Sequence, residues 1–178
     1  MIHKLSLTAL ILVVGAALAG DDHELFNFSA KSPDWFVVND GVMGGVSTSR
    51  LSPAAGAMLF DGTVSLENNG GFASFRGPVS FPAGSGVLLL TVRGDGRRYK
   101  LTLKLDDGTN TAQYQAAFVA PPQWQTLRFK SEDFAASFRG RAVEAPVVRF
   151  ADVQYVGLLI SDQQAGAFRI ELKDIRAE

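Results

Sequence analysis

Carboxylates are the side chains of this sequence that come closest to a catalytic set. A glycosidase needs only two of them, facing each other across a cleft at roughly 5–10 Å. The candidates are Asp40, Glu67, Asp95 and Asp162. All but Glu67 stand beside glycines or at the end of a predicted strand, where Asp side chains usually bond nearby backbone N–H groups. We therefore expect structural roles for them, and a carboxylate-dependent hydrolase is the weakest of three functions considered.

Other catalytic chemistry is poorly represented. The histidines are His3 and His23, both near the N-terminus, and the sequence has no cysteine. This argues against a Ser-His-Asp triad, a His-based zinc site and any thiolate chemistry. The glycine-rich stretch 39–51 is not followed directly by Lys-Ser or Lys-Thr, or by a predicted helix, so it is not a phosphate-binding loop. We predict no metal, no cofactor and no enzymatic activity.

Composition is that of an ordinary globular domain. The chain has 178 residues, of which 47% are hydrophobic and 20% charged, and its formal net charge is −1. This length suits one domain with a substantial core. Lys and Arg are spread along the chain, whereas binding to nucleic acid normally requires a basic patch. We predict no nucleic-acid partner.

The N-terminus has the pattern of a secretory signal peptide. A short basic start precedes an uncharged run from Leu5 to Ala19, which ends in a small-x-small cleavage site. The run is short for a membrane span, which needs about 20 residues. We predict cleavage near Ala19, export to the periplasm or medium, and no membrane span afterwards; an uncleaved anchor is the alternative. No cysteine follows the run, which excludes a lipid anchor there.

Alternation of apolar and polar residues dominates the rest of the chain. In "RRYKLTLKL", Tyr99, Leu101 and Leu103 share one face, and basic residues and Thr occupy the other, as in a half-buried strand. The stretches "TAQYQAAF" and "AFRIELKDI" alternate in the same way. By contrast, 87–92 and 153–160 are apolar on both faces, which predicts central strands covered on both sides.

Turn-forming residues separate these runs. Residues 106–110 predict a hairpin, and 68–71 and 94–96 predict tight turns with positive φ. Residues 131–134 predict one short helical turn. About ten or eleven strands follow one another at spacings of roughly 8–12 residues. We therefore predict one all-β domain over 24–178, an antiparallel β-sandwich or jelly roll.

Five blocks of sequence resemble one known family. They are "WFVVNDGVMGGVSTSRL", "FDGTVSLENNGGFASFR", "VRGDGRRYKL", "WQTLRF" with "DFAASFRGR", and the closing "VGLLISDQQAGAFRIELKDIRA". In this order they are similar to the complex I intermediate-associated protein 30 (CIA30) family, over residues 35–177. The pair "NDGVMGGVS" and "ENNGGFAS" is the most specific part of the resemblance.

The resemblance implies both a fold and a function. The family fold is a galactose-binding-domain-like β-sandwich, akin to carbohydrate-binding modules. Mitochondrial members are chaperone-like assembly factors of respiratory complex I (NADH:ubiquinone oxidoreductase) and are not known as enzymes. The resemblance therefore implies a non-enzymatic protein that binds protein intermediates through its sandwich. An export signal departs from this pattern, because the mitochondrial role is on the matrix side.

The alternative function is that of a periplasmic carbohydrate-binding module. It predicts a groove with at least one exposed ring among Trp35, Trp124, Tyr114 and Tyr155. The assembly-factor function instead predicts an exposed apolar patch of several hundred Å². The partner is thus a protein, such as a complex I intermediate or another envelope protein, or a glycan.

The loops that carry the family motifs supply the candidate binding residues. The apolar residues Val42, Met43 and Val46 admit three interpretations: a plug under the sandwich, a partner surface formed by Met43, or a structural corner that closes one end of the core. The full candidate set is Asn39, Asp40, Met43, Ser47, Asn68, Asn69, Arg93, Asp95, Arg98, Trp124, Arg139 and Asp162.

Two of these candidates also have a structural prediction. Arg93 is expected to form an ion pair with Asp95 or Asp162, because charges beside apolar strands usually need a partner. Trp124, like Trp35, precedes a predicted strand and is expected to close the core.

Overall fold

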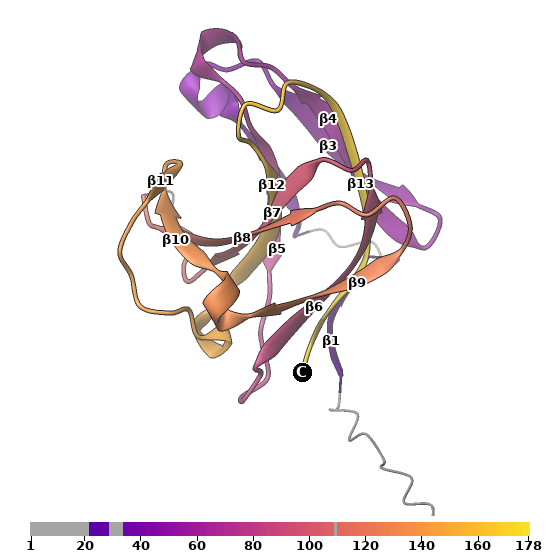
Figure 1. The fold of residues 1–178 in the computed structure, drawn as a ribbon, viewed down its shortest axis with the longest axis vertical. Coiled ribbons are helices and arrows are strands. Elements are labelled where there is room, and N and C mark those ends of the chain that lie inside the picture. Colours follow the sequence, from indigo (N-terminus) through magenta and orange to yellow (C-terminus); the bar gives the residue numbers. More distant parts are fainter. Residues whose placement is uncertain (1–21, 29–33, 109) are drawn as a thin grey trace, which may run out of the picture.

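Two antiparallel sheets packed face to face make up the fold (Figure 1). The computed structural model describes residues 22–28, 34–108 and 110–178, and the predicted signal peptide 1–19 lies outside them. The predicted all-β sandwich is confirmed, but these residues form thirteen strands rather than ten or eleven. Among the described residues, no helix has the length and apolar character needed to cross a membrane.

The first sheet has six strands. Their order is β3-β4-β13-β6-β9, and β1 also pairs with β13. The predicted central strand 87–92 falls within β6, between β13 and β9. The six strands are β1 (His23–Asn27), β3 (Thr48–Ala54), β4 (Ala57–Val64), β6 (Val87–Gly94), β9 (Gln125–Lys130) and β13 (Gly166–Ala177).

The second sheet has seven strands in the order β11-β10-β8-β7-β12-β5-β2. β12 is an interior strand of this sheet, between β7 and β5, as its apolar sequence predicts. β7 and β8 are antiparallel neighbours, which confirms the predicted hairpin. The seven strands are β2 (Phe36–Asn39), β5 (Ala73–Pro78), β7 (Arg98–Lys104), β8 (Gln113–Val119), β10 (Ala135–Phe138), β11 (Arg141–Ala142) and β12 (Tyr155–Ile160).

Short 3-10 helices occupy several connections. η3 confirms the helical turn predicted near Ser131, and the Asp133 carboxylate accepts a hydrogen bond from the Lys130 N–H at 2.7 Å. Around η2, Asn68 and Asn69 have positive φ, as predicted for this turn. The four helices are η1 (Asp40–Met43), η2 (Glu67–Asn69), η3 (Ser131–Asp133) and η4 (Phe150–Asp152).

β13 pairs with three strands of the six-stranded sheet: β4, β6 and β1. Its first half alternates as predicted, and Phe168, Ile170 and Leu172 are buried. A register shift follows Leu172. Such a bulge moves one residue out of the alternation, so the inward positions become Ile175 and Ala177.

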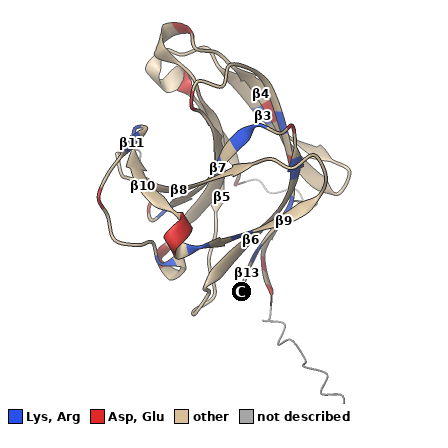
Figure 2. Cartoon of the chain, viewed as in Figure 1, with Lys and Arg blue, Asp and Glu red and all other residues tan. Residues whose placement is uncertain are grey.

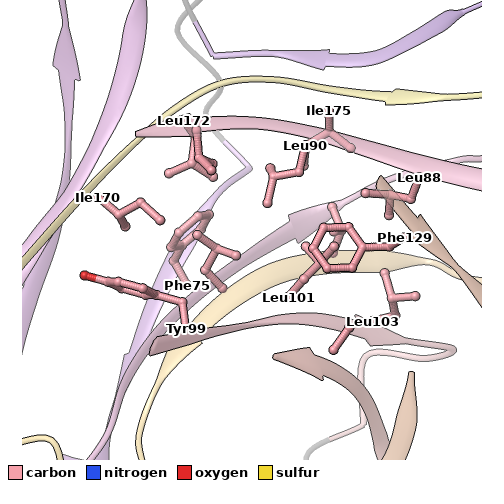
Figure 3. Packing of buried hydrophobic residues seen from close by; sticks show 14 of the residues in the cluster. Phe75, Leu88, Leu90, Tyr99, Leu101, Leu103, Phe129, Ile170, Leu172 and Ile175 are labelled. Atoms are coloured by element: carbon pink, nitrogen blue, oxygen red, sulfur yellow. The ribbon is translucent and has the colours of Figure 1, made fainter. Parts of the chain in front are cut away.

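The core lies between the two sheets (Figure 3). Leu88, Leu90 and Leu172 from the six-stranded sheet face Leu101 and Leu103 from β7. All five side chains are buried. Burial of each large apolar side chain contributes roughly 1.5–3 kcal/mol to the free energy of folding. This contribution determines which face of each strand points inward.

One prediction about β7 is wrong. The alternation predicts a half-buried strand with its polar face in water, yet Thr102 and Lys104 on that face are 7% and 5% exposed. Residues at the two edges of the seven-stranded sheet line the same hollow as these side chains. The outer face of this sheet is therefore concave, and its polar residues lie at the bottom of a groove.

Candidate functional site

A groove lies on the outer face of the seven-stranded sheet. Its volume is about 870 Å³, which lies within the range of roughly 300–1,000 Å³ typical of ligand sites. In Figure 1 the β10–β11 hairpin stands on one side of the floor strands β7 and β12. Val42 and Met43 of η1 line the groove, together with Arg139 and Gly140 of the β10–β11 turn.

Strand register sets the floor in rows that run across the sheet. In the middle row, Thr102 of β7 lies opposite Gln115 of β8 on one side and Gly157 of β12 on the other. Gly157 in turn lies opposite Arg76 of β5. Since side chains at paired positions point to the same face, Gln115, Thr102 and Arg76 from three strands form one polar strip across the sheet.

The neighbouring rows add an aromatic ring and a second cation. Tyr155 of β12 lies opposite Lys104 of β7, and both line the groove. On the other side of the middle row, Lys100 lies opposite Leu159, which lies opposite Ser74. Tyr155 and Leu159 are the partly exposed apolar surfaces of this floor. The floor thus combines amides, hydroxyls and cations with the ring of Tyr155.

Asp40 anchors the η1 side of the groove. Its carboxylate is fully buried and accepts hydrogen bonds from the Ser47 N–H (3.0 Å) and the Ser47 hydroxyl (2.5 Å). It also accepts from the N–H groups of Gly71 (2.7 Å) and Phe72 (3.3 Å). Burial alone would raise the pKa of Asp40, but these hydrogen bonds outweigh it and lower the pKa. A carboxylate that accepts this many hydrogen bonds from the protein itself has a structural role.

The glycines of both motif loops leave room for this carboxylate. A Cβ on Gly45 would overlap the Asp40 side chain, and a Cβ on Gly70 would lie 2.6 Å from its Oδ2. The stretches "NDGVMGGVS" and "ENNGGFAS" are therefore two halves of one cluster around Asp40. The cluster fixes η1 at the groove edge.

The structural-corner interpretation of this loop is correct only in part. The backbone does turn around Asp40, but Val42, Met43 and Val46 are 75%, 61% and 48% exposed. Neither a plug nor closure of the core by these residues is correct. Their exposure follows from the cluster, because Asp40 takes the buried position and turns its apolar neighbours outward.

Other predicted site residues near this loop have structural partners. The Asn39 carbonyl oxygen Oδ1 accepts a hydrogen bond from the Ser49 hydroxyl at 2.6 Å. Asn68 and Asn69 are exposed at the turn behind the Asp40 cluster. Of the twelve predicted residues, the groove gathers only Met43, Arg139 and Asp162.

The predicted partners of Arg93 are wrong. Its guanidinium donates to the Glu171 carboxylate at 2.7 Å and lies over the Trp124 ring, 4.8 Å from the centroid. The reason is register, since Arg93 of β6 lies opposite Glu171 of β13. Trp124 does not close the core as predicted, because it is 39% exposed in this contact. This group lies on the six-stranded sheet, away from the groove.

Asp95 and Arg98 belong to a turn at one end of the sandwich. The Asp95 carboxylate accepts hydrogen bonds from the Tyr99 hydroxyl (3.1 Å) and the Arg169 N–H (2.8 Å). Tyr99 points inward and Arg98 outward, as predicted. Burial, and then the charge of Asp95, raise the pKa of Tyr99. Arg98 is tied to Gln164 through its backbone N–H and C=O groups.

The carbohydrate-binding alternative predicts an exposed aromatic ring in a groove, and Tyr155 meets this condition. Trp35 and Tyr114 are buried, so neither offers a stacking surface. Trp35 packs against Phe75 in the core, as predicted. Tyr155 is partly exposed in the groove, and Trp124 is exposed on the other sheet.

A catalytic or metal-binding arrangement does not form in the groove. Asp162 is the one carboxylate among the described residues that line it, and its Oδ1 accepts a hydrogen bond from Lys100 Nζ at 2.6 Å. This bond lowers the pKa of Asp162. In the part of the chain that the structure describes, no three His, Cys, Asp or Glu residues are placed to hold a metal ion.

Sequence reasoning missed most of the groove floor. Arg76, Lys100, Lys104, Gln113 and Gln115 line the groove, but none of them is among the predicted site residues. The available signal was the concentration of amides and cations on the outward positions of β7 and β8. It could not be used without knowing that both strands share a sheet with β5 and β12.

Comparison with known proteins agrees with the motif blocks. Residues 25–172 match the family described as complex I intermediate-associated protein 30 (CIA30). The chain belongs to the CIA30 family. No curated protein matches this family member.

Solved structures of carbohydrate-binding modules share its fold. One is the family 11 module from Clostridium thermocellum in complex with a β-1,3-1,4-mixed-linked tetrasaccharide, with a TM-score of 0.62 and 11% identity, covering 88% of this chain and 94% of that chain. A mutant of the family 29 module CBM29-2 has a TM-score of 0.52 and 13% identity, covering 89% and 92%. At these identities the likeness establishes the sandwich fold alone.

Proposed function

We propose that this CIA30 family member is a non-catalytic glycan-binding protein that holds its ligand in the groove of the seven-stranded sheet. The observation that carries the proposal is the floor itself, where hydrogen-bonding side chains from four strands line the same groove as the ring of Tyr155. Few polar side chains are otherwise buried on an outer sheet face. Here they lie at the bottom of a hollow, directed at the space where a ligand would sit.

The chemistry of the floor suits a sugar. A pyranose ring presents an apolar C–H face to an aromatic ring and a rim of hydroxyls to polar groups. Tyr155 supplies the ring, and Gln113 and Gln115 supply amides that both donate and accept. The groove lacks a second carboxylate beside Asp162 among the described residues, so it does not support glycosidase chemistry.

The test is a glycan-binding assay on the full chain, followed by a matched pair of aromatic substitutions. Tyr155→Ala removes the groove ring, whereas Trp124→Ala removes the exposed ring of the other sheet. Loss of a stacking ring costs about 1–3 kcal/mol, so Tyr155→Ala should weaken binding about fivefold or more. Trp124→Ala should leave affinity unchanged.

Two results would contradict the proposal. Absence of binding to any glycan in a broad array would remove the function. A loss of affinity in Trp124→Ala but not in Tyr155→Ala would place the ligand on the six-stranded sheet instead. Thermal unfolding of both variants would establish that each is folded.

A second candidate function is protein binding of the kind named by the family. Its supporting observation is the exposure of Val42, Met43 and Val46 on one loop held rigid by Asp40. Exposed apolar clusters mark interaction sites, and Met adapts to varied surfaces. Here the partner would be a membrane-protein assembly intermediate, such as one of complex I.

A pull-down from mildly solubilised native envelopes separates the two candidates. If the protein-binding role is correct, the wild type co-purifies with a defined partner that Met43→Ser no longer captures. Recovery of the same proteins by both baits would contradict this role. Export is also part of the proposal, and N-terminal sequencing of the protein from its native envelope should begin just after Ala19.

A further inference from the structure

The groove has an excess of positive charge. The charged residues that line it are Arg76, Lys100, Lys104, Arg139 and Asp162, which is four cations against one carboxylate. Lys100 and Asp162 form an ion pair and neutralise each other. The remaining cations of the lining have no carboxylate of the lining to pair with.

Arg76 is the best-placed of these cations. It lies in the middle row of the floor, opposite Gly157, where no side chain of β12 intervenes. Among the described residues its guanidinium contacts the ring of Phe36, 5.0 Å from the centroid, and forms no ion pair. Stacking on a ring holds the guanidinium plane in place and leaves its N–H edge available.

Lys104 is buried in the same groove floor, with β12 between its strand and that of Arg76. Its ammonium donates to the Gly108 carbonyl and the Thr111 hydroxyl, both at 2.7 Å, so one of its three N–H donors is left over. Asp106 lies 3.9 Å away. Burial lowers the pKa of Lys104, Asp106 opposes this, and the charge of Arg76 lowers it further. Arg76 and Lys104 thus carry the same charge on one groove floor, and an anion bound there would be attracted by both.

Arg139 adds charge at the edge. It sits in the β10–β11 turn with φ of 47° and lies over the Phe138 ring, 5.2 Å from the centroid. Its guanidinium reaches Asn110 Oδ1 at 3.3 Å, which is a neutral partner. The lining therefore presents positive charge at the centre and at the rim.

Resting on the proposed glycan-binding function, we infer that the groove takes an acidic glycan, with a uronate carboxylate or a sulfate ester bound by Arg76 and Lys104. The planar guanidinium fork of Arg matches the two oxygens of such groups. A neutral glycan would leave the Arg76 guanidinium without an anionic partner. Arg139 would contact a second acidic unit further along the chain.

The experiment is isothermal titration calorimetry of the full chain with short oligogalacturonates, a sulfated oligosaccharide and neutral cello-oligosaccharides. We expect tighter binding of an acidic ligand than of the neutral one. Arg76→Gln should weaken the acidic ligand at least about tenfold, since it removes charge-assisted hydrogen bonds, and should change neutral binding less than about twofold. Acidic binding should also weaken between about 50 and 500 mM salt.

The matched control is Arg50→Gln, which removes the same charge from a residue paired with Asp61 on the other sheet. It should bind like the wild type. If thermal unfolding shows that Arg76→Gln is not folded, Arg139→Gln provides a second groove variant, because Arg139 is an exposed turn residue. Its affinity for the acidic ligand should fall about threefold or more.

The outcomes separate the two proposals. Equal binding of neutral and acidic glycans, with no effect of Arg76→Gln or Arg139→Gln, overturns the acidic-ligand inference and leaves glycan binding intact. Absence of binding to every glycan overturns the proposed function as well. Equal binding of single-stranded DNA would overturn the inference by showing unspecific attraction of polyanions. Preference for uronate over sulfate, or the reverse, identifies the acidic group.

Discussion

The outer faces of the two sheets differ in whether their arginines are paired with carboxylates. On the six-stranded sheet, Arg50 pairs with Asp61 and Arg93 with Glu171, in each case directly across neighbouring strands. On the seven-stranded sheet, Arg76 has an aromatic ring for a neighbour and no carboxylate among the described residues. Figure 2 shows that both signs of charge occur over the fold as a whole.

This difference assigns different roles to the two faces. Charges that pair with one another on a flat face keep that face soluble and contribute little to stability. Cations left unpaired in a hollow cost free energy in the empty protein, and a ligand that compensates them recovers it. The net charge of −1 conceals this asymmetry, which appears only when the strands are placed in their sheets.

The largest expected effect is the loss of stability on removing Asp40, the buried carboxylate that accepts hydrogen bonds from the backbone. Asp40→Ala leaves the N–H groups of Ser47, Gly71 and Phe72 without their acceptor. Loss of a buried carboxylate with several donors should lower the free energy of unfolding by about 3 kcal/mol. Urea denaturation measures this. A change within about 0.5 kcal/mol would show that the cluster does not hold the loops together.

The glycines around Asp40 allow a matched test of close approach. Gly45→Ala places a methyl group on the Asp40 carboxyl, whereas a Cβ on Gly41 meets nothing within 4 Å. We expect a loss of about 2 kcal/mol for Gly45→Ala from overpacking and a change below about 0.5 kcal/mol for Gly41→Ala. Equal melting temperatures of the two variants would contradict the role given to Gly45.

The difference in charge between the two faces can be reduced by a substitution that adds a carboxylate to the groove. Gln115→Glu has nearly the same shape and introduces a carboxylate in the row of Arg76. Affinity for an acidic oligosaccharide should fall about tenfold, because the new charge competes with the ligand. Calorimetric titration checks this, with Gln125→Glu on exposed β9 as the control. A gain in affinity would be inconsistent with an anion site.

The smallest effect is expected on the paired face. Burial alone would raise the pKa of Glu171, but hydrogen bonds from Arg93 and Arg169 outweigh it and lower the pKa. A lowered pKa means that this carboxylate stabilises the fold above pH 4.5, its ordinary value, and that the contribution disappears as the pH falls through the lower, folded-state value.

Glu171→Gln should therefore cost about 1 kcal/mol at neutral pH and less in acid. Urea unfolding of wild type and variant across this pH range measures the difference. Glycan affinity should not change. If the variant lost stability equally at all pH values, the ion pair would not be the source of the effect.

The sequence predicted the fold because local patterns decide it. Alternation placed Tyr99, Leu101 and Leu103 inward, and apolar runs placed β6 and β12 in the interior of their sheets. The bulge in β13 could not be foreseen, because it depends on the register with β6.

The site could be predicted only in fragments, because its partners are distant in sequence. Asp40 was expected to bond its own turn, but two of its donors lie 31 and 32 residues away. Arg93 was expected to pair with Asp95 or Asp162, but its partner is Glu171, 78 residues further on. The floor joins β5, β7, β8 and β12, and no local pattern states which strands become neighbours.

The most direct test of the account is to map the ligand onto one of the two faces. An isotope-labelled full chain would be titrated with a short acidic oligosaccharide while backbone amide resonances are followed by NMR. The account predicts shifts concentrated in β5, β7, β8 and β12, with the largest near Arg76, Lys104 and Tyr155. Shifts confined to β6, β9 and β13, or none at saturating ligand, would contradict it.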